Sequence, residues 1–198
     1  MTIGRVIKVI GYFIFQIQKW RLGKIGKKCK VFHRLILVNP KYVEIGDDFT
    51  AGSNVKLQVW IKKSNEEKNT IPHIDIGSHV AIMSNCQISC IKHVVIEDGV
   101  LLGENVFITD NNHGAGDARE LVIPPHDRDL FSKGEVIIHK NVWIGRNVCI
   151  MPGVEIGEGA IIGANAVVTK DVPSFSVVAG VPATIIRQRT KSENGVKR

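Results

Sequence analysis

Cysteine and histidine side chains are the groups in this chain best suited to metal or acid–base chemistry. The 198 residues include four cysteines and seven histidines. Cys86 and Cys90, with His93 close by, form the densest group, but their spacing matches no standard zinc pattern and a fourth ligand is missing. Four cysteines are also too few for a disulfide framework. We therefore predict free thiols, a reducing compartment and no metal.

One histidine stands apart because of its place in the chain. His113 comes immediately before residues 114–135, a stretch with Gly, Asp and Pro that interrupts an otherwise regular pattern. A long loop in an economical fold is usually functional. Imidazole, with a pKa of about 6.5, is also a suitable general base near neutral pH. We expect the other histidines at the surface or in packing contacts.

The regular pattern is an aliphatic residue at every sixth position. Its clearest run is Ile138, Ile144, Ile150, Ile156, Ile162 and Val168. Neither the helical period of about 3.6 residues nor the strand period of about 2 fits this spacing. Each hexad predicts a short strand and a turn, and three hexads predict one coil of a triangular prism. Successive coils, stacked about 4.8 Å apart, then bury the aliphatic residues, so the chain is predicted to be an all-β solenoid of parallel strands.

Composition and charge agree with this fold and exclude other classes. Hydrophobic residues make up 44% of the chain and aromatic residues only 6%, with 19 glycines, which excludes general disorder and an aromatic-rich core. The net charge of +7 is confined to the ends, because residues 1–30 carry +8 and residues 187–198 carry +4. Residues 31–186 are left with −5, the wrong sign for a nucleic-acid-binding body.

Two segments resemble the hexapeptide-repeat acyltransferases. They are VWIGRNVCIMPGVEIGEGAIIGANAVVTKDVP at residues 142–173 and AGVPA at residues 179–183. A third segment, VFITDNNHG at residues 106–114, is most similar to bacterial O-antigen, capsule and exopolysaccharide O-acetyltransferases. The resemblance covers residues 31–187. It implies a left-handed parallel β-helix, a homotrimer with active sites between subunits, and acetyl-CoA as the acyl donor without a metal.

The resemblance implies an acetyl-CoA-dependent O-acetyltransferase that acts on a sugar hydroxyl in cell-surface polysaccharide biosynthesis. One alternative is N-acetylation of an amino sugar nucleotide. Another, from a different class, is a non-catalytic solenoid scaffold, which would bind no CoA.

The same resemblance assigns roles to individual residues. His113 matches the catalytic base of the family. Asp110 is expected either to orient the imidazole or to cap a turn, and Asn85 is expected to orient it or to contact the substrate. Arg128 and Ser132 either contact an acceptor sugar, close the site of the adjoining subunit, or lie on a solvated loop face.

Further positions match the donor side of the family's site. Trp143 either walls the site or lies in a trimer interface. The residues that match positions lining the pantetheine groove or contacting CoA are Gly145, Ala164, Thr169, Lys170 and Arg187. Arg187 corresponds to a basic residue that meets a CoA phosphate, for which a guanidinium group is well suited.

The N-terminal segment is predicted to be a basic amphipathic helix. Residues 1–30 precede the β-helix of residues 31–187, and a basic tail follows at 188–198. The helix either caps the open end of the solenoid or lies on an anionic membrane surface. No apolar segment is as long as the about 18 residues that a membrane-spanning helix needs, and no signal peptide is expected. We therefore predict a cytoplasmic protein, with membrane association at the inner face as the open alternative.

Overall fold

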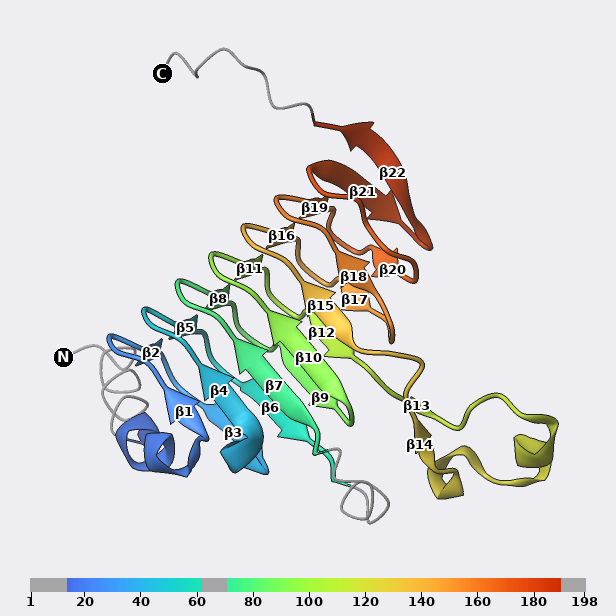
Figure 1. Ribbon diagram of the computed structural model, residues 1–198, viewed down its shortest axis with the longest axis horizontal. Coiled ribbons are helices and arrows are strands. Elements are labelled where there is room, and N and C mark those ends of the chain that lie inside the picture. The colour runs from blue at the N-terminus through green and yellow to red at the C-terminus, as the bar shows by residue number, and fades with distance from the viewer. Residues whose placement is uncertain (1–13, 62–70, 190–198) are drawn as a thin grey trace.

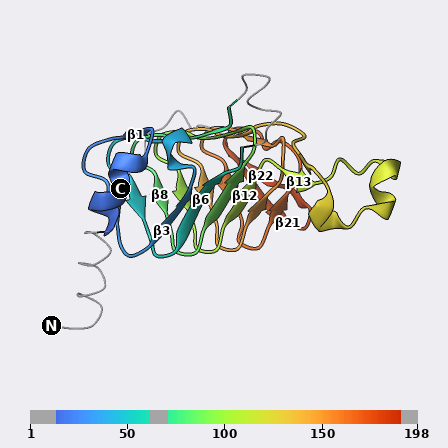
Figure 2. The same ribbon diagram turned by 90° about the horizontal axis from the view of Figure 1, so that it is seen from below.

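Three parallel β-sheets wrap into a triangular prism in the computed structural model, which describes residues 14–61 and 71–189 (Figures 1 and 2). Sheet A contains, in order, β1 (Lys24–Ile25), β4 (Val43–Ile45), β7 (His73–Ile76), β10 (His93–Ile96), β15 (Val136–Ile138) and β18 (Glu155–Ile156). Sheet B contains β2 (Lys30–Val31), β5 (Thr50–Ala51), β8 (Ala81–Ile82), β11 (Leu101–Leu102), β16 (Trp143–Ile144), β19 (Ile161–Ile162), β21 (Ser176–Gly180) and β22 (Ala183–Gln188). Sheet C contains β3 (Leu35–Val38), β6 (Val55–Val59), β9 (Gln87–Cys90), β12 (Phe107–Thr109), β17 (Cys149–Ile150) and β20 (Val167–Val168).

The chain passes from sheet A to B to C in every coil, so each strand pairs with the equivalent strand of the next coil. Ile96, for example, pairs with Ile76 on one side and with Ile138 on the other. All members of the aliphatic run that predicted the fold are at most 1% exposed. The predicted parallel solenoid is therefore confirmed, and the six-residue beat is the inward-facing ladder of its core.

Asparagines form a second ladder at the edge where sheet B turns into sheet C. Asn54, Asn85, Asn105, Asn147 and Asn165 all have positive φ there. Asn tolerates this left-handed backbone better than most residues, which explains its recurrence. Side-chain amides join neighbouring coils, with Asn105 Nδ2 3.0 Å from Asn147 Oδ1 and Asn147 Nδ2 2.9 Å from Asn165 Oδ1.

A long excursion leaves the prism where sheet C turns into sheet A. After β12 the chain runs out through β13 (Asn112–His113) and returns through β14 (Leu130–Phe131), which pairs with β13 antiparallel. Between them lie two 3-10 helices, η3 (Ala118–Val122) and η4 (Pro125–Asp127). We call residues 114–135 the arm, and Figures 1 and 2 show it standing away from the prism.

The N-terminal end of the prism is covered by a short helical segment. Residues 14–18 are α-helical and continue into the 3-10 helix η1 (Lys19–Arg21). Phe15 and Leu22 pack into the core cluster and are 1% and 8% exposed. Strand pairing already begins at Lys24, inside the segment predicted as a cap, because the first coil uses these residues to bury the base of the ladder. Another 3-10 helix, η2 (Pro40–Tyr42), links the first two coils.

The ends of the chain bear on the remaining predictions. Residues 1–13 and most of the predicted basic tail, 190–198, lie outside the described residues. At the C-terminal end of sheet B, β21 and β22 form an antiparallel hairpin. No helix within residues 14–61 and 71–189 is long and apolar enough to cross a membrane.

Candidate active site

The strand end that leads to His113 is held by buried polar residues. Thr109 is 3% exposed, and its hydroxyl bonds to both backbone groups of Asn111. The Asn111 side-chain amide reaches the carbonyl and hydroxyl of Ser89 in the preceding coil, at 3.1 and 3.2 Å. The backbone just before His113 is therefore fixed against its neighbour. The sequence carries little signal for these positions, because a Thr and an Asn near a loop are common turn residues.

Asp110 caps a turn, which is one of the two roles predicted for it. Its side chain is fully buried, and its oxygens accept hydrogen bonds from the backbone N–H groups of Ile91, Lys92 and His93 at 2.8, 2.8 and 3.0 Å. Asn111 Nδ2 donates a further bond to Oδ1. The carboxylate is thus occupied by the turn between β9 and β10, and no hydrogen bond joins it to the His113 ring in the described structure.

His113 lies on a short ribbon at the base of the arm. It pairs with Leu130 across the antiparallel ribbon, and the next residue, Gly114, donates its N–H to the Asp129 carbonyl at 2.9 Å. The His113 side chain is exposed. Within residues 14–61 and 71–189 no group is placed to hydrogen bond with its imidazole, so the ring is free to meet a substrate or another copy of the chain.

Glu120 fixes the first turn of the arm beside His113. Its carboxylate accepts the N–H groups of Ala115, Gly116 and Asp117 at 3.0, 2.9 and 3.3 Å, and the first of these does most to hold its pKa below the usual value. Gly114 has φ of +89°, and a Cβ there would lie 2.4 Å from Glu120 Oε2, so this turn requires glycine.

The arm turn could have been found in the sequence. Asp117 and Glu120 form a capping box at the start of η3, in which Asp117 accepts the Arg119 N–H at 2.9 Å. An acidic residue followed three positions later by Glu is the recognised pattern for such a box. The pair is easily missed among the glycines and prolines of residues 114–135, which by themselves predict turns.

Arg128, one of the two arm residues singled out from the sequence, lies beside Gly114, the residue that follows His113. Its Cδ is 3.0 Å from the position that a Cβ on Gly114 would take, and its Nε donates to the Ile123 carbonyl at 2.9 Å. The Ser132 hydroxyl donates to the Gly134 carbonyl at 3.1 Å, at the return of the arm. Both side chains thus have a hydrogen-bond partner within the arm, and Arg128 lies beside the glycine that follows His113.

Two of the residues matched to CoA lie on the same edge of the prism as His113. Thr169 and Lys170 directly follow β20, and both are exposed. Strands β12, β17 and β20 are consecutive in sheet C, so Thr169 lies two coils beyond Thr109, about 10 Å along the prism. The edge between sheets C and A therefore carries His113, the arm, Thr169 and Lys170.

Another group of predicted site residues lies on a different edge, between sheets B and C. Asn85 is held there in the asparagine ladder, where its Oδ1 accepts from Asn54 Nδ2 at 3.3 Å. Asn85 comes four residues before Ser89, and Ser89 pairs with Thr109. About 13 Å of strand therefore separates Asn85 from the strand end that leads to His113. The expectation that Asn85 orients His113 is therefore not met within one chain.

Gly145 and Ala164 occupy the same edge as Asn85, on adjoining coils. A Cβ on Gly145 would lie 2.7 Å from the Ala164 backbone nitrogen, so glycine is needed there for the coils to stack. Ala164 is exposed.

The remaining two predicted residues lie on sheet B. Trp143 stands on its outer face between Leu101 and Ile161, and is 52% exposed. Arg187 is on β22, opposite Val177, and is also exposed. The side chains of Trp143 and its exposed neighbour Leu101 make the outer face of sheet B apolar around Trp143.

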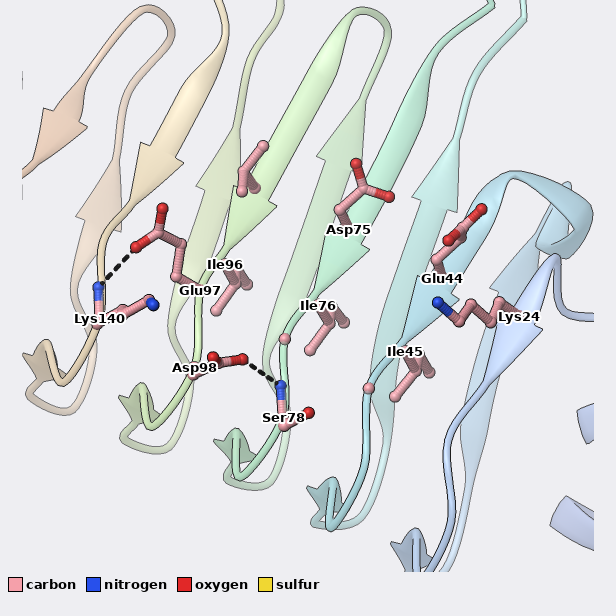
Figure 3. Close-up of a pocket in the computed structure, with 13 residues that line it drawn as sticks. Lys24, Glu44, Ile45, Asp75, Ile76, Ser78, Ile96, Glu97, Asp98 and Lys140 are labelled. Carbon is pink, nitrogen blue, oxygen red and sulfur yellow. Dashed lines mark hydrogen bonds between the residues drawn. The ribbon is translucent and has the colours of Figure 1, made fainter.

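A separate pocket of about 360 Å³ lies on the outer face of sheet A (Figure 3). None of the predicted site residues lines it. Two of its acidic side chains accept hydrogen bonds from backbone N–H groups of the adjoining turns. Asp98 Oδ1 accepts the Ser78 N–H at 2.7 Å, and Glu97 Oε2 accepts the Lys140 N–H at 3.1 Å. The pocket is therefore a consequence of coil packing and not part of the candidate site.

Histidines on this face pair with carboxylates of neighbouring coils. His93 Nε2 is 2.7 Å from Asp75 Oδ2. His139 lies between Glu155, at 2.8 Å, and Glu97, at 3.2 Å, and the hydrogen bond to Glu155 is the main cause of its raised pKa. These pairs agree with the expectation that these histidines have packing roles. No group of three or more His, Cys, Asp or Glu side chains in the described ranges is placed to hold a metal ion.

The cysteines are free thiols, as predicted. Cys86 and Cys90 are buried, and burial raises the pKa of the Cys86 thiol to about 11 and that of Cys90 further. Both therefore remain protonated at neutral pH and are unsuited to act as nucleophiles.

Comparison with known proteins places the chain in a family. Residues 135–170 match the model for the bacterial transferase hexapeptide (six repeats). The putative lipopolysaccharide biosynthesis O-acetyl transferase WbbJ of Escherichia coli strain K12 is 34% identical over 154 residues, 76% of this chain and 74% of that one. The chain belongs to the hexapeptide-repeat transferases. It is therefore an acyltransferase, and family membership weighs against the non-catalytic scaffold.

Other relatives support the family and the fold. The galactoside O-acetyltransferase of E. coli strain K12 is 37% identical over 121 residues, 59% of this chain and 54% of that one. AntD, an N-acyltransferase from Bacillus cereus solved with dTDP and coenzyme A, superposes with a TM-score of 0.73 at 20% identity, covering 89% of each chain. VCA0836 of Vibrio cholerae, solved with acetyl coenzyme A, gives 0.60 at 23% identity over 89% of this chain and 76% of that one. The three parallel sheets and these neighbours fit a left-handed β-helix.

Proposed function

We propose that this hexapeptide-repeat transferase moves an acetyl group from acetyl-CoA to a sugar hydroxyl during cell-surface polysaccharide biosynthesis. The observation that carries the proposal is the exposed His113 imidazole, held on a short antiparallel ribbon at the base of the arm. The names of the WbbJ and galactoside relatives support an oxygen acceptor. Because acetyl-CoA is a cytoplasmic metabolite, we place the reaction in the cytoplasm.

His113 acts as the general base. It takes the proton of the acceptor hydroxyl while the oxygen attacks the acetyl carbonyl, and it returns that proton to the departing CoA sulfur. A new C–O bond forms as the C–S bond breaks, so no covalent enzyme intermediate and no metal are needed. Because Asp110 is committed to its turn, the partner that orients the ring comes from the substrate or from a neighbouring subunit.

The donor residues fit an extended ligand that follows the prism. Thr169 and Lys170 continue the edge on which His113 lies, and Lys170 and Arg187 are exposed cations suited to CoA phosphates. Gly145 and Ala164 offer a backbone with little side-chain cover. In this proposal the arm residue Arg128 contacts the acceptor sugar, whereas Ser132 and Asn85 play supporting roles at the rim of the site.

Apart from Trp143 and Arg187 on sheet B, the predicted residues divide between two edges of one prism, which supports a site shared by two copies. His113, Thr169 and Lys170 lie at the edge between sheets C and A, whereas Asn85 and Ala164 lie at the edge between sheets B and C. A homotrimer would place one edge of each chain beside the other edge of its neighbour. The apolar face around Trp143 is the surface we assign to this interface.

The test of the chemistry is His113→Ala. We expect turnover with acetyl-CoA to fall by about 10²- to 10⁴-fold, while the melting temperature and CoA affinity measured by calorimetry stay unchanged because the side chain is exposed. Unchanged turnover would overturn the assignment. If the wild-type protein binds no CoA at all, the donor assignment is wrong.

The shared site has its own experiment. His113→Ala and Ala164→Trp damage opposite edges, so oligomers that contain both variants restore some complete sites. We expect co-expressed variants to regain part of the activity that neither variant shows alone. No recovery, or a monomer in sedimentation velocity, would contradict a site between subunits.

N-acetylation of an amino sugar nucleotide is the second candidate. AntD, whose fold this chain shares, has been solved with dTDP-4-amino-4,6-dideoxyglucose and CoA, so the fold accommodates such an acceptor in that protein. Parallel assays with nucleotide-linked amino sugars and with neutral glycans separate the two reactions. Mild alkali removes the added acetyl mass from an acetate ester but not from an acetamide, so mass spectrometry before and after this treatment tells the products apart.

A further inference from the structure

The helical segment at the N-terminal end of the prism has two different faces. Phe15 and Leu22 face inward and are 1% and 8% exposed, which closes the first coil. Ile14, Ile17 and Trp20 recur at every third position and are 42%, 74% and 84% exposed. The segment therefore caps the solenoid and also presents large apolar side chains outward. Covering the first coil requires only the buried side chains of Phe15 and Leu22, so the outward apolar side chains are not explained by the cap.

Basic residues surround these apolar side chains. The segment 14–30 contains Lys19, Arg21, Lys24, Lys27, Lys28 and Lys30 and no acidic residue. A pocket of about 770 Å³ between the helical segment and the first coil is lined by Trp20 together with Lys19, Lys27, Lys28 and Lys30. Carboxylates of the second coil lie next to this segment: Asp47 accepts the Lys27 backbone N–H at 2.7 Å, and Glu44 lies opposite Lys24 in the register of the parallel strands. Every charged side chain within residues 14–30 is nevertheless cationic.

From this combination we propose that the N-terminal end surface, residues 14–30, docks on the surface of a bilayer that contains anionic phospholipid. Exposed aromatic and aliphatic side chains beside a cluster of lysines are the pattern of proteins that lie in a membrane interface. The positive charge complements anionic headgroups, whereas a second copy of the same surface would repel it. The attachment that we propose is peripheral. No helix in the described ranges is long and apolar enough to cross a membrane.

This docking would orient the active site. Sheet C strands β3, β6, β9 and β12 are consecutive, so the strand end that leads to His113 lies three coils above the first, about 15 Å along the prism. A sugar chain attached to a lipid carrier reaches that height with a few residues. This last point rests on the proposed function, whereas the docking itself does not.

The experiment is vesicle binding by the full chain in the absence of acetyl-CoA. We expect the protein to sediment with vesicles of phosphatidylcholine and phosphatidylglycerol at low salt, to dissociate as salt is raised, and not to bind phosphatidylcholine alone. Each lysine contributes about five-fold to partitioning, so Lys27→Gln with Lys28→Gln should weaken binding about 25-fold. Ile17→Ser with Trp20→Ser should weaken it about ten-fold or more.

Controls separate a specific surface from net charge and from folding. Lys56→Gln with Lys140→Gln removes the same charge elsewhere on the prism and should leave binding within about two-fold. All these side chains are exposed or half-exposed, so melting temperatures and CoA affinity should not change. The Trp20 fluorescence should shift to the blue on vesicles, a shift that Trp20→Phe abolishes.

Three outcomes would overturn the proposal. They are failure of the wild-type chain to bind anionic vesicles, equal weakening by the control pair, and a loss of oligomer mass in the Ile17/Trp20 variant, which would assign the apolar face to a second copy. None of these results depends on whether acetyl transfer is observed.

Discussion

The capping role of Asp110 makes a quantitative prediction about stability. In Asp110→Ala three backbone N–H groups, those of Ile91, Lys92 and His93, lose their acceptor, and Asn111 loses a partner. Hydrogen bonds to a charged group are worth about 1.5–3 kcal/mol each. They are not additive here, since Lys92 and His93 are partly exposed and water can replace some of the bonds. We therefore expect a loss of about 3–5 kcal/mol in the free energy of unfolding.

Asp110→Asn is the more discriminating variant. It keeps the shape of the side chain and one acceptor oxygen, but its amide NH₂ then faces backbone N–H donors, so about half of the loss should remain, about 2 kcal/mol. Asp127→Ala, which removes an exposed carboxylate in the arm, should stay within about 0.5 kcal/mol of wild type. Urea unfolding at one fixed protein concentration measures all of them, since any oligomer makes stability depend on concentration.

The alternative role predicts the opposite pattern. If Asp110 served to orient His113, Asp110→Asn would unfold at the wild-type urea midpoint while its turnover fell by about 10²-fold or more. That combination would refute the capping argument. We expect instead that Asp110→Asn, assayed well below its melting temperature, keeps the pH–rate profile of wild type.

The pKa of His139 is raised in the folded protein, chiefly by its hydrogen bond to Glu155. The charged imidazole therefore stabilises the fold at pH values below the pKa of an unfolded histidine, and this stability is lost as the pH rises through the pKa of the folded state. His139→Gln should therefore cost most at about pH 6 and progressively less in alkaline urea titrations; an equal cost at every pH would contradict it. The Glu120 carboxylate, with its lowered pKa, orders the arm above its unfolded pKa and ceases to do so as the pH falls through the folded value. Glu120→Gln should raise the acceptor KM and speed proteolysis of the arm while the melting temperature holds, and an unchanged KM would argue against the arm as an acceptor contact. Gly145→Val should lower the melting temperature as well as CoA affinity because its side chain meets the next coil; lost affinity at an unchanged melting temperature would show that this glycine serves CoA alone.

The sequence by itself determined the fold and the place of the excursion. A six-residue beat buries every aliphatic residue when the chain coils into a prism of stacked parallel strands, and Ile144 and Ile162 lie where such a prism puts them. The left hand of the coil came from the family resemblance and not from the spacing. His113 was singled out because it directly precedes residues 114–135, which interrupt the beat, and because it matches the family's motif. The beat and its interruption are local properties of the chain, so spacing and residue type were enough to read them.

Only the tertiary structure decided what the polar residues near the site do. Whether Asp110 caps a turn or orients a ring depends on which N–H groups the preceding coil places beside it, and those belong to residues 91–93. Where Asn85 lies relative to His113 depends on how many residues each coil places on each face of the prism. The irregular step after Ile88 prevented that number from being read from the spacing alone. The two faces of residues 14–22 likewise emerge only when Phe15 meets the first coil and leaves Trp20 outside. Periodicity fixes which residues point inward, but the partners of a polar group are set by stacking residues that lie about twenty positions apart in the chain.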